Sequence, residues 1–348
     1  MTRPKVAIVA ASSGIGEVGG VERLYAGLRN ALDSAGLETE IVPTVSDESD
    51  FEQIKRSYLR FYDLDLSGFD GVVSTKAPSY AIRHPNHVGY LVHTMRVFYD
   101  MFETEFPDPS ATLLEQRQRI HQLDTAALAP QRLRHLYTIG HEVKERLRHH
   151  NGLDAEVLHH PTTLGGLRQG KYEYILLPGR LHRWKRVDLM IAAMKLVRQP
   201  IKLLITGTGE DQAFFETLAD GDPRIRFLGR VSEDDLRALY ADALAVAFVP
   251  KREDLGLITL EAFGSGKPVI TCTDSGEPSR LVRHEESGFV SRPDASAIAG
   301  WVERLAQNPE LAATMGSRGQ ASVAHITWDR IGTVLAGALG FADPSPSL

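Results

Sequence analysis

The sequence predicts an α/β fold of two doubly wound domains, each built on a parallel β-sheet. Short apolar runs rich in β-branched residues alternate with longer amphipathic runs, the pattern of strands and crossover helices. Parallel neighbouring strands need such crossovers, because a tight turn cannot join them. The alternation starts at Lys5 and restarts after His160, and 348 residues suit two domains of ordinary size.

The first domain is predicted over residues 1–164. It begins with a strand at 5–11, which is short, apolar and followed by Ser-Ser-Gly. A helix is expected at 21–35, where apolar residues recur every three or four positions. A second helix is expected at 141–149. The further strands expected in this domain are 38–43, 70–75, 89–94, 135–140 and 156–161.

The second domain is predicted over residues 172–325, after a Thr- and Gly-rich linker at 161–171 that breaks both periodicities. The expected strands are 174–178, 202–206, 225–228, 244–250 and 268–272, and the expected helices are 187–197, 211–220, 232–242 and 257–264. Ser232, three residues before Asp235, is a candidate N-cap. A last helix at 326–340 has no strand after it, so we expect it to pack back on the first domain.

The composition excludes several classes of protein. A formal net charge of −6 gives no overall attraction to nucleic acid. The single cysteine, Cys272, cannot form an internal disulfide or a multi-thiolate zinc site. The longest apolar run, 243–249, is far shorter than the ~20 residues that cross a bilayer, and no leader-like segment opens the chain. We therefore expect a cytoplasmic, enzyme-sized protein.

A first glycine cluster spans residues 12–20, Ser-Ser-Gly-Ile-Gly-Glu-Val-Gly-Gly, between a strand and a helix. This position brings backbone N–H groups and a helix N-terminus close to an anion or a hydroxyl. A tight turn without a ligand is the alternative explanation for the glycines. The start of the cluster is also similar to the cofactor turn of short-chain dehydrogenases, but no tyrosine here is followed four residues later by the lysine those enzymes need.

A second cluster, residues 177–186, joins the first strand of the second domain to a helix. It carries four basic side chains, Arg180, Arg183, Lys185 and Arg186. An arginine fork and a lysine point charge suit two adjacent phosphates. A solvated basic turn is the alternative that the sequence leaves open.

A third cluster, residues 253–261, follows a strand and opens a helix at Gly256 and Leu257. The free N–H groups and the positive dipole end of that helix are expected to point toward a ligand. Glu253 and Glu261 are placed to hold sugar and ribose hydroxyls on either side of a diphosphate. Charge complementarity at a helix start is the simpler explanation for two glutamates.

These clusters, with others in the same order, resemble family 4 of the retaining glycosyltransferases, which have the GT-B fold of two Rossmann-like domains facing across a cleft. The motifs are Gly19-Gly-Val-Glu-Arg23, Gly179-Arg-Leu-x-x-x-Lys185, Gly207-Thr-Gly209, Phe227-Leu-Gly-Arg-Val231, Glu253-x7-Glu261 and Gly264-x-Gly-Lys-Pro-Val269. Residues 90–100 are similar to a bacterial mannosyltransferase-type subgroup. The segment 274–280 departs from the family pattern, with Glu277 and Arg280 where the family has glycine and glutamate.

The resemblance implies that Arg180 and Lys185 bind the donor diphosphate, together with the N–H groups of Leu257 and Ile258 at the helix that follows Gly256. It implies no metal and no cofactor, because these cationic groups stabilise the leaving phosphate. The nucleotide sugar would be a co-substrate, GDP-mannose or a UDP-sugar.

The resemblance also assigns roles around the sugar and the nucleoside. Glu253 would hold the donor sugar and Glu261 the ribose, while the backbone at Arg230 and Val231 would meet the base. In the first domain, His93 would lie beside the anomeric carbon. Gly19 and Gly20 would approach the phosphate or the acceptor. Glu253, His93, Arg180 and Lys185 form the implied catalytic set.

The implied reaction moves a hexosyl group to a hydroxyl acceptor such as a glycan, a glycolipid or a natural product. Three alternatives stay open from the sequence. They are a nucleotide-sugar epimerase on the same fold, a nicotinamide-dependent dehydrogenase, and a non-catalytic subunit that binds nucleotide sugars. The basic stretch 132–150 is interpreted as a solvated helix, with contact to an anionic membrane surface as the alternative. Its adjacent histidines are not a metal site.

Overall fold

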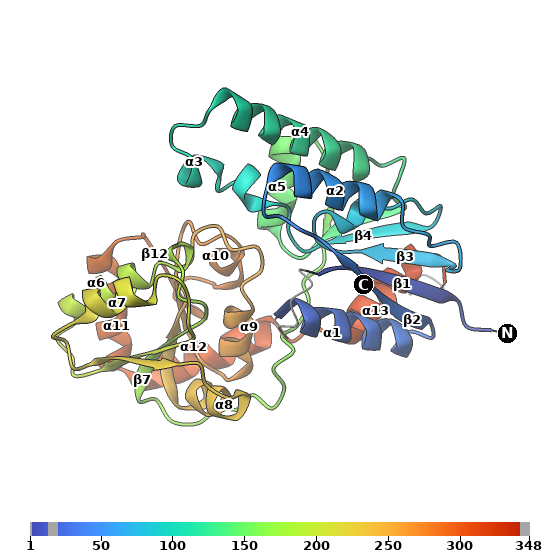
Figure 1. Ribbon diagram of the computed structural model, residues 1–348. Coiled ribbons are helices and arrows are strands. Elements are labelled where there is room, and N and C mark those ends of the chain that lie inside the picture. Colours follow the sequence, from blue (N-terminus) through green and yellow to red (C-terminus); the bar gives the residue numbers. More distant parts are fainter. Residues whose placement is uncertain (1, 13–19, 342–348) are drawn as a thin grey trace. The chain divides into compact units, whose positions relative to one another are not determined.

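The computed structural model describes residues 2–12 and 20–341, except for the side chains of 20–22. The chain divides into two compact units, one made of 1–163 with 326–348 and the other of 164–325 (Figure 1). Each unit holds a six-stranded sheet whose strands all run parallel. The predicted α/β class with two Rossmann-like domains is confirmed.

The first unit has the strand order β2-β1-β3-β4-β5-β6. Its strands are β1 (Lys5–Ser12), β2 (Glu38–Val45), β3 (Gly71–Ser74), β4 (His87–Leu91), β5 (His135–Thr138) and β6 (Glu156–Val157). Its α-helices are α1 (Gly20–Ser34), α2 (Phe51–Tyr62), α3 (Phe102–Glu105), α4 (Ala111–Ala127), α5 (His141–Asn151) and α13 (Trp328–Ala338), with 3-10 turns η1 (Ser79–Ala81) and η2 (Arg96–Phe98). Helices α1 and α13 lie on one face of the sheet and α2, α4 and α5 on the other (Figure 1).

The second unit has the order β12-β11-β10-β7-β8-β9. Its strands are β7 (Tyr174–Pro178), β8 (Lys202–Thr206), β9 (Ile225–Gly229), β10 (Ala243–Ala247), β11 (Val269–Cys272) and β12 (Gly288–Ser291). Its helices are α6 (Val187–Leu196), α7 (Gln212–Ala219), α8 (Glu233–Asp242), α9 (Leu257–Gly264), α10 (Glu277–Leu281), α11 (Ala295–Ala306) and α12 (Pro309–Ser322), with η3 (Arg183–Lys185). As predicted, Ser232 caps α8 by accepting a hydrogen bond from the Asp235 amide.

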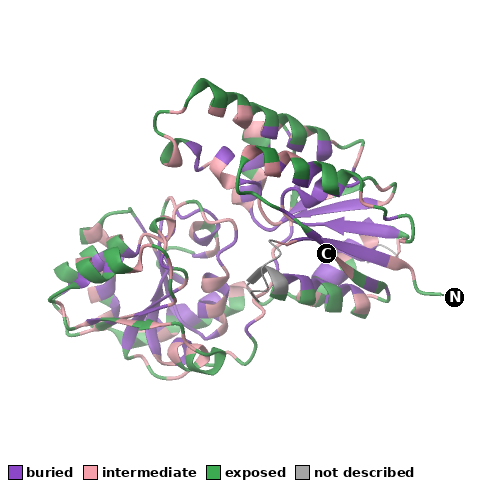
Figure 2. Ribbon diagram, in the orientation of Figure 1, coloured by how far each residue is buried: buried purple, intermediate pink, exposed green. Residues whose placement is uncertain are grey.

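Central strands of both sheets are buried on both faces, and this is why their sequences are continuously apolar (Figure 2). In β7, Ile175 belongs to the apolar core that includes residues of α6, α7 and α11, whereas its neighbour Leu176 belongs to the core that includes residues of α8 and α9. This alternation follows from the two-residue period of a strand. The sheet is therefore the fixed centre of the unit, and its strand ends position the loops.

Several predicted strands are longer than the observed ones. The strand expected at 156–161 ends at Val157, and the one expected at 89–94 runs instead over His87–Leu91. The sequence analysis assigned no range to α2 or α4. In α4 the buried positions are Ile120, Asp124 and Ala127, and a buried carboxylate interrupts the apolar period that reveals a helix.

The basic stretch 132–150 is not the simple solvated helix that we predicted. Arg146 of α5 is buried and pairs with the equally buried Asp100, with 2.8 Å between Arg146 Nε and Asp100 Oδ1. A sequence shows a charge but not its partner 46 residues away. Among the helices that the structure describes, none is long and apolar enough to span a bilayer.

Candidate functional site

The residues predicted to bind the donor diphosphate and sugar follow the carboxyl ends of β7 and β10, and β8 is the other sheet neighbour of β7. These three strands are neighbours in the sheet. In open parallel sheets the ligand sites lie outside this edge, because the connections there leave a crevice. The second unit alone therefore gathers Arg180, Lys185, Glu253 and the start of α9 at one edge.

The loop after β7, residues 179–186, is held between its two neighbours. On one side the Leu181 amide donates to the Thr208 carbonyl at 3.1 Å, and the Asp211 amide donates to the Leu181 carbonyl at 3.1 Å. On the other side the Lys251 amide donates to the Trp184 carbonyl at 2.7 Å. Backbone bonds on both sides fix the loop that carries the cations.

Lys185 and Glu253, two predicted site residues, form an ion pair. Lys185 Nζ lies 2.7 Å from Glu253 Oε2, and 5.5 Å from the centre of the Phe248 ring. The side chains are 26% and 21% exposed, so the pair is partly shielded from water. A lysine beside a carboxylate at a strand end offers a cation to a phosphate and an acceptor to a hydroxyl.

Arg180 pairs with a residue that sequence analysis did not single out, Glu210 of the loop after β8. Arg180 Nε lies 3.1 Å from Glu210 Oε2, and Nη2 lies 3.2 Å from Oε1. Each predicted phosphate cation thus has its own carboxylate partner.

Arg186 holds the loops of the site together through hydrogen bonds of its guanidinium. Its guanidinium donates to the carbonyls of Val249 and Pro250 at 2.6 and 2.7 Å, and both carboxylate oxygens of Asp274 accept from it at 2.7 and 2.8 Å. It therefore connects the β7 loop to the loops after β10 and β11. Sequence analysis grouped Arg186 with the other basic residues of its turn and missed this role.

Gly256 precedes the first turn of α9 and has φ +78°. A Cβ there would lie 2.6 Å from Pro278 Cγ and 3.0 Å from Phe248 Cε1, so both the backbone angle and the space require glycine. The N–H groups that open a helix have no acceptor inside it. A Cβ on Gly179 would lie 3.3 Å from Ile258 Cδ1, which shows that the start of the cationic loop lies against this turn.

Glu261, inside α9, is also held by a partner. The buried Tyr240 hydroxyl of α8 donates to Glu261 Oε2 at 2.6 Å. Burial raises the pKa of Tyr240 well above its usual value, and the Glu261 charge raises it further, so the hydroxyl stays a donor. The carboxylate predicted to bind ribose is thereby fixed in position.

The segment after β11 positions Glu253, although it departs from the family pattern. The Glu253 amide donates to the Ser275 carbonyl at 2.9 Å, and the Glu277 amide donates to the Glu253 carbonyl at 2.9 Å. A Cβ on Gly276 would lie 2.5 Å from the Glu253 carbonyl oxygen. Gly276 itself is therefore the residue in this segment that could have indicated how close the segment comes to the Glu253 backbone.

The remaining predicted residues lie elsewhere. Exposed Arg230 and half-buried Val231 follow β9, the sheet neighbour of β8. His93 follows β4 in the first unit, where its Nδ1 lies 3.0 Å from the Thr94 carbonyl oxygen. Gly20 opens α1, and Gly19 lies outside the described residues.

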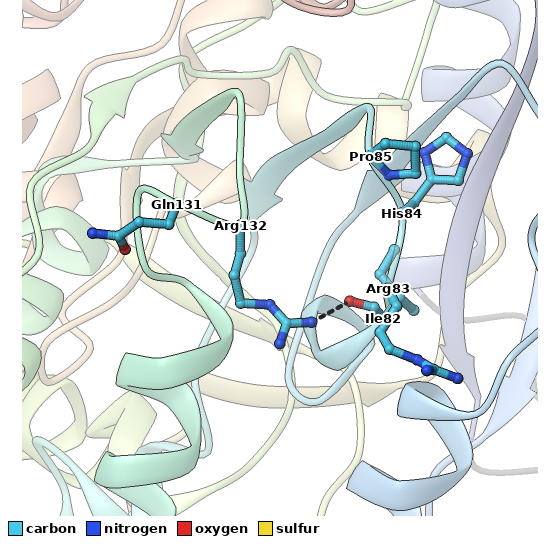
Figure 3. A pocket seen from close by; sticks show the side chains of 6 residues that line it. All are labelled: Ile82, Arg83, His84, Pro85, Gln131 and Arg132. Atoms are coloured by element: carbon cyan, nitrogen blue, oxygen red, sulfur yellow. Dashed lines mark hydrogen bonds between the residues drawn. The ribbon is translucent and has the colours of Figure 1, made fainter.

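A hollow in the first unit lies at the opposite edge of its sheet from His93, which follows the carboxyl end of β4. It is lined by Ile82, Arg83, His84, Pro85, Gln131 and Arg132, and Arg132 Nη2 donates to the Ile82 carbonyl at 2.9 Å (Figure 3). These residues precede β4 and β5, so the hollow lies at the amino edge of the sheet. We therefore do not count it as part of the site.

Residues 166–322 match the family described as Glycosyl transferases group 1. The matched segment lies within the second unit and spans almost all of it. The chain is 27% identical over 175 residues to human alpha-1,3/1,6-mannosyltransferase ALG2, covering 44% of this chain and 42% of that one. It is 32% identical over 173 residues to a GDP-mannose-dependent monoacylated alpha-(1-6)-phosphatidylinositol monomannoside mannosyltransferase of Corynebacterium glutamicum, covering 46% and 45%. The alignments thus span less than half of these relatives.

Solved structures support the fold over nearly the whole chain. Sucrose-phosphate synthase from Thermosynechococcus elongatus superposes with a TM-score of 0.76 at 20% identity, covering 96% of this chain and 98% of that one. Anabaena HepE, solved with UDP and glucose, superposes with a TM-score of 0.71 at 14% identity, covering 98% and 100%. The fold is GT-B, as the sequence motifs predict.

Proposed function

We propose that this protein is a retaining glycosyltransferase that moves a hexosyl group from a nucleotide-diphosphate sugar to a hydroxyl acceptor. The observation that carries the proposal is the Lys185–Glu253 pair, located beside the first turn of α9 in a group 1 domain. GDP-mannose and UDP-sugars are the proposed donors. One relative is named GDP-mannose-dependent, and HepE was solved with UDP.

The proposed chemistry is electrostatic. As the bond between the anomeric carbon and the diphosphate oxygen breaks, negative charge grows on the leaving phosphate. Arg180, Lys185 and the N–H groups of Leu257 and Ile258 would stabilise that charge, a role that needs neither metal nor cofactor. The freed phosphate would then act as base for the incoming hydroxyl on the same face, which retains the configuration.

The other groups would hold the substrates. Glu253 would accept hydrogen bonds from sugar hydroxyls, Glu261 from the ribose, and the backbone at 230–231 would meet the base. His93 would contact the sugar. Its Nδ1 lies 3.0 Å from a carbonyl and so carries the proton, which makes Nε2 of the neutral ring an acceptor. We propose that the acceptor, a glycan, glycolipid or natural product, binds the first unit, and that the protein works in the cytoplasm.

The epimerase alternative draws no support from these comparisons, since the relatives described above are transferases. It still predicts a distinct product: an isomerised nucleotide sugar formed without acceptor. The dehydrogenase alternative predicts stabilisation by NAD(P).

A thermal-shift panel of UDP-, GDP-, TDP- and ADP-sugars tests the proposal. A ligand present at 100 times its dissociation constant adds about 2.7 kcal/mol to folding stability, so one sugar nucleotide should raise the melting temperature measurably. NMR of the transferred product would then show a retained anomeric configuration. Stabilisation by NAD(P) alone, or an inverted product, would contradict the proposal.

A further inference from the structure

The Glu210 carboxylate occupies the guanidinium of Arg180, the side chain that we propose binds the donor diphosphate. Both of its oxygens meet the guanidinium fork, at 3.1 and 3.2 Å. His182 Nε2 lies 3.4 Å from Glu210 Oε1. Because His182 Nδ1 accepts from the Trp184 amide at 3.1 Å, Nε2 of the neutral ring carries the hydrogen. Glu210 thus accepts two hydrogen bonds from Arg180 and also lies beside His182.

Hydrogen bonds hold the β7 and β8 loops together. The Leu181 amide donates to the Thr208 carbonyl and the Asp211 amide donates to the Leu181 carbonyl. The Arg183 amide also donates to Asp211 Oδ2 at 2.6 Å. The two loops therefore hold Arg180 and Glu210 side by side. The side chains themselves are 70% and 47% exposed, so water screens the pair and another anion can replace the carboxylate.

We infer that Glu210 is a resident competitor for Arg180, which the diphosphate of the nucleotide must displace in order to bind. The inference rests on the proposed function, because it takes Arg180 as a phosphate ligand. On binding, the guanidinium fork exchanges a carboxylate for phosphate oxygens, and Glu210 turns to water. No covalent bond changes.

This competition acts more strongly on the product than on the donor. The nucleoside diphosphate carries a free terminal phosphate and hence more negative charge than the sugar ester. A carboxylate beside Arg180 therefore opposes the product more, and Glu210 would favour product release.

Calorimetric titration of UDP and GDP into the Glu210→Gln variant tests this directly. The amide keeps the shape and removes the charge. Since exposed ion pairs change an equilibrium by a factor of about two to five, the dissociation constant of the bound nucleotide should fall by that factor. The inhibition constant of the product should fall more than the donor KM. Glu216→Gln on α7, an exposed carboxylate paired with Gln212, is the matched control and should leave binding unchanged.

A double variant shows whether Glu210 acts through Arg180. In an Arg180→Gln background, Glu210→Gln should no longer tighten nucleotide binding. If the unmodified chain binds UDP or GDP and Glu210→Gln leaves the affinity unchanged or weaker, the inference is wrong while the proposed function stands. If the unmodified chain binds neither nucleotide, the proposed function fails, and the inference fails with it.

Discussion

Arg180 and Lys185 each face a carboxylate at the carboxyl edge of the second sheet, Glu210 and Glu253 respectively. Both cations lie on a loop whose backbone is held by hydrogen bonds on two sides, so the backbone positions of these residues do not depend on the ion pairs. A diphosphate entering this edge would meet positive groups already in place. Such preorganisation is the basis of electrostatic catalysis.

Replacing either Arg180 or Lys185 with alanine should therefore remove about 2–4 kcal/mol of transition-state stabilisation, as loss of a preorganised oxyanion donor does. The measurement is kcat/KM for sugar transfer. Arg226→Ala, which removes an exposed cation from β9, is the control and should keep nearly full activity. Near-normal turnover of both site variants would refute their assignment.

Asp124 of α4 is a fully buried carboxyl group in the first unit. The hydroxyls of Tyr80 and Tyr99 donate to it at 2.7 and 2.6 Å, and Tyr58 donates as well. Burial raises the pKa of Asp124 from 3.8 to about 6, although the three tyrosine donors lower it in part. The folded chain therefore holds this proton more tightly than the unfolded chain does.

The stabilising contribution of Asp124 is fully present below pH 3.8 and is lost as the pH rises through 6. Between pH 7 and pH 5, the unmodified chain should gain about 1 kcal/mol of unfolding free energy relative to Asp124→Asn. Urea unfolding of both proteins at the two pH values measures this. An equal difference at both pH values would contradict it.

At the scale of elements, the first turn of α9 depends on Gly256. Alanine substitutions at two glycines of the second unit distinguish the free-energy cost of a left-handed backbone from the cost of a steric clash. Gly256 and Gly221 both have positive φ, +78° and +84°, but only Gly256 has neighbours within 4 Å of an added Cβ. The pair is therefore a matched comparison.

Gly221→Ala should cost about 1–2 kcal/mol of stability, the price of the left-handed conformation alone. Gly256→Ala should cost about 1–3 kcal/mol more, because Pro278 and Phe248 must also shift. It should also weaken nucleotide binding, since the N–H groups of α9 move. Urea midpoints and calorimetric titration check both effects. Equal stability losses would show that space at Gly256 is unimportant.

The elements whose bounds were predicted best are short apolar segments that lie next to glycines. Strand β7 and helix α9 have apolar runs and nearby glycines, and their predicted bounds match the structure. The roles of Arg186 and Glu210 could not be predicted, because their partners are distant along the chain and surface charges carry no period. The positioning of Glu253 could not be predicted either, because it depends on backbone hydrogen bonds, which any residue type can form. Gly276 is the exception, since the close contact there requires glycine.

At the scale of the whole chain, the C-terminal helix completes the N-terminal unit. In α13, a Cβ on Gly332 would lie 2.2 Å from the Ala31 carbonyl oxygen of α1. A Cβ on Gly27 of α1 would lie 2.3 Å from the Trp328 ring, which also stacks with His160 at 5.7 Å between ring centres. The two helices touch where their residues are small.

Gly27→Ala should therefore destabilise the first unit by about 1–3 kcal/mol through overpacking. Gly300→Ala in α11 is the control. Nothing lies within 4 Å of its added Cβ, so it should stabilise the chain by about 0.4–1 kcal/mol. Melting temperatures of the two variants should move in opposite directions. A stabilised Gly27→Ala would show that α1 and α13 are not closely packed in solution.

A crystal structure with UDP or GDP bound would locate the diphosphate relative to the proposed cations. We expect phosphate oxygens within hydrogen-bonding distance of Arg180, Lys185 and the Leu257 and Ile258 amides, with Glu210 released from Arg180. A diphosphate bound elsewhere, with Arg180 still on Glu210 and Lys185 still on Glu253, would contradict this expectation.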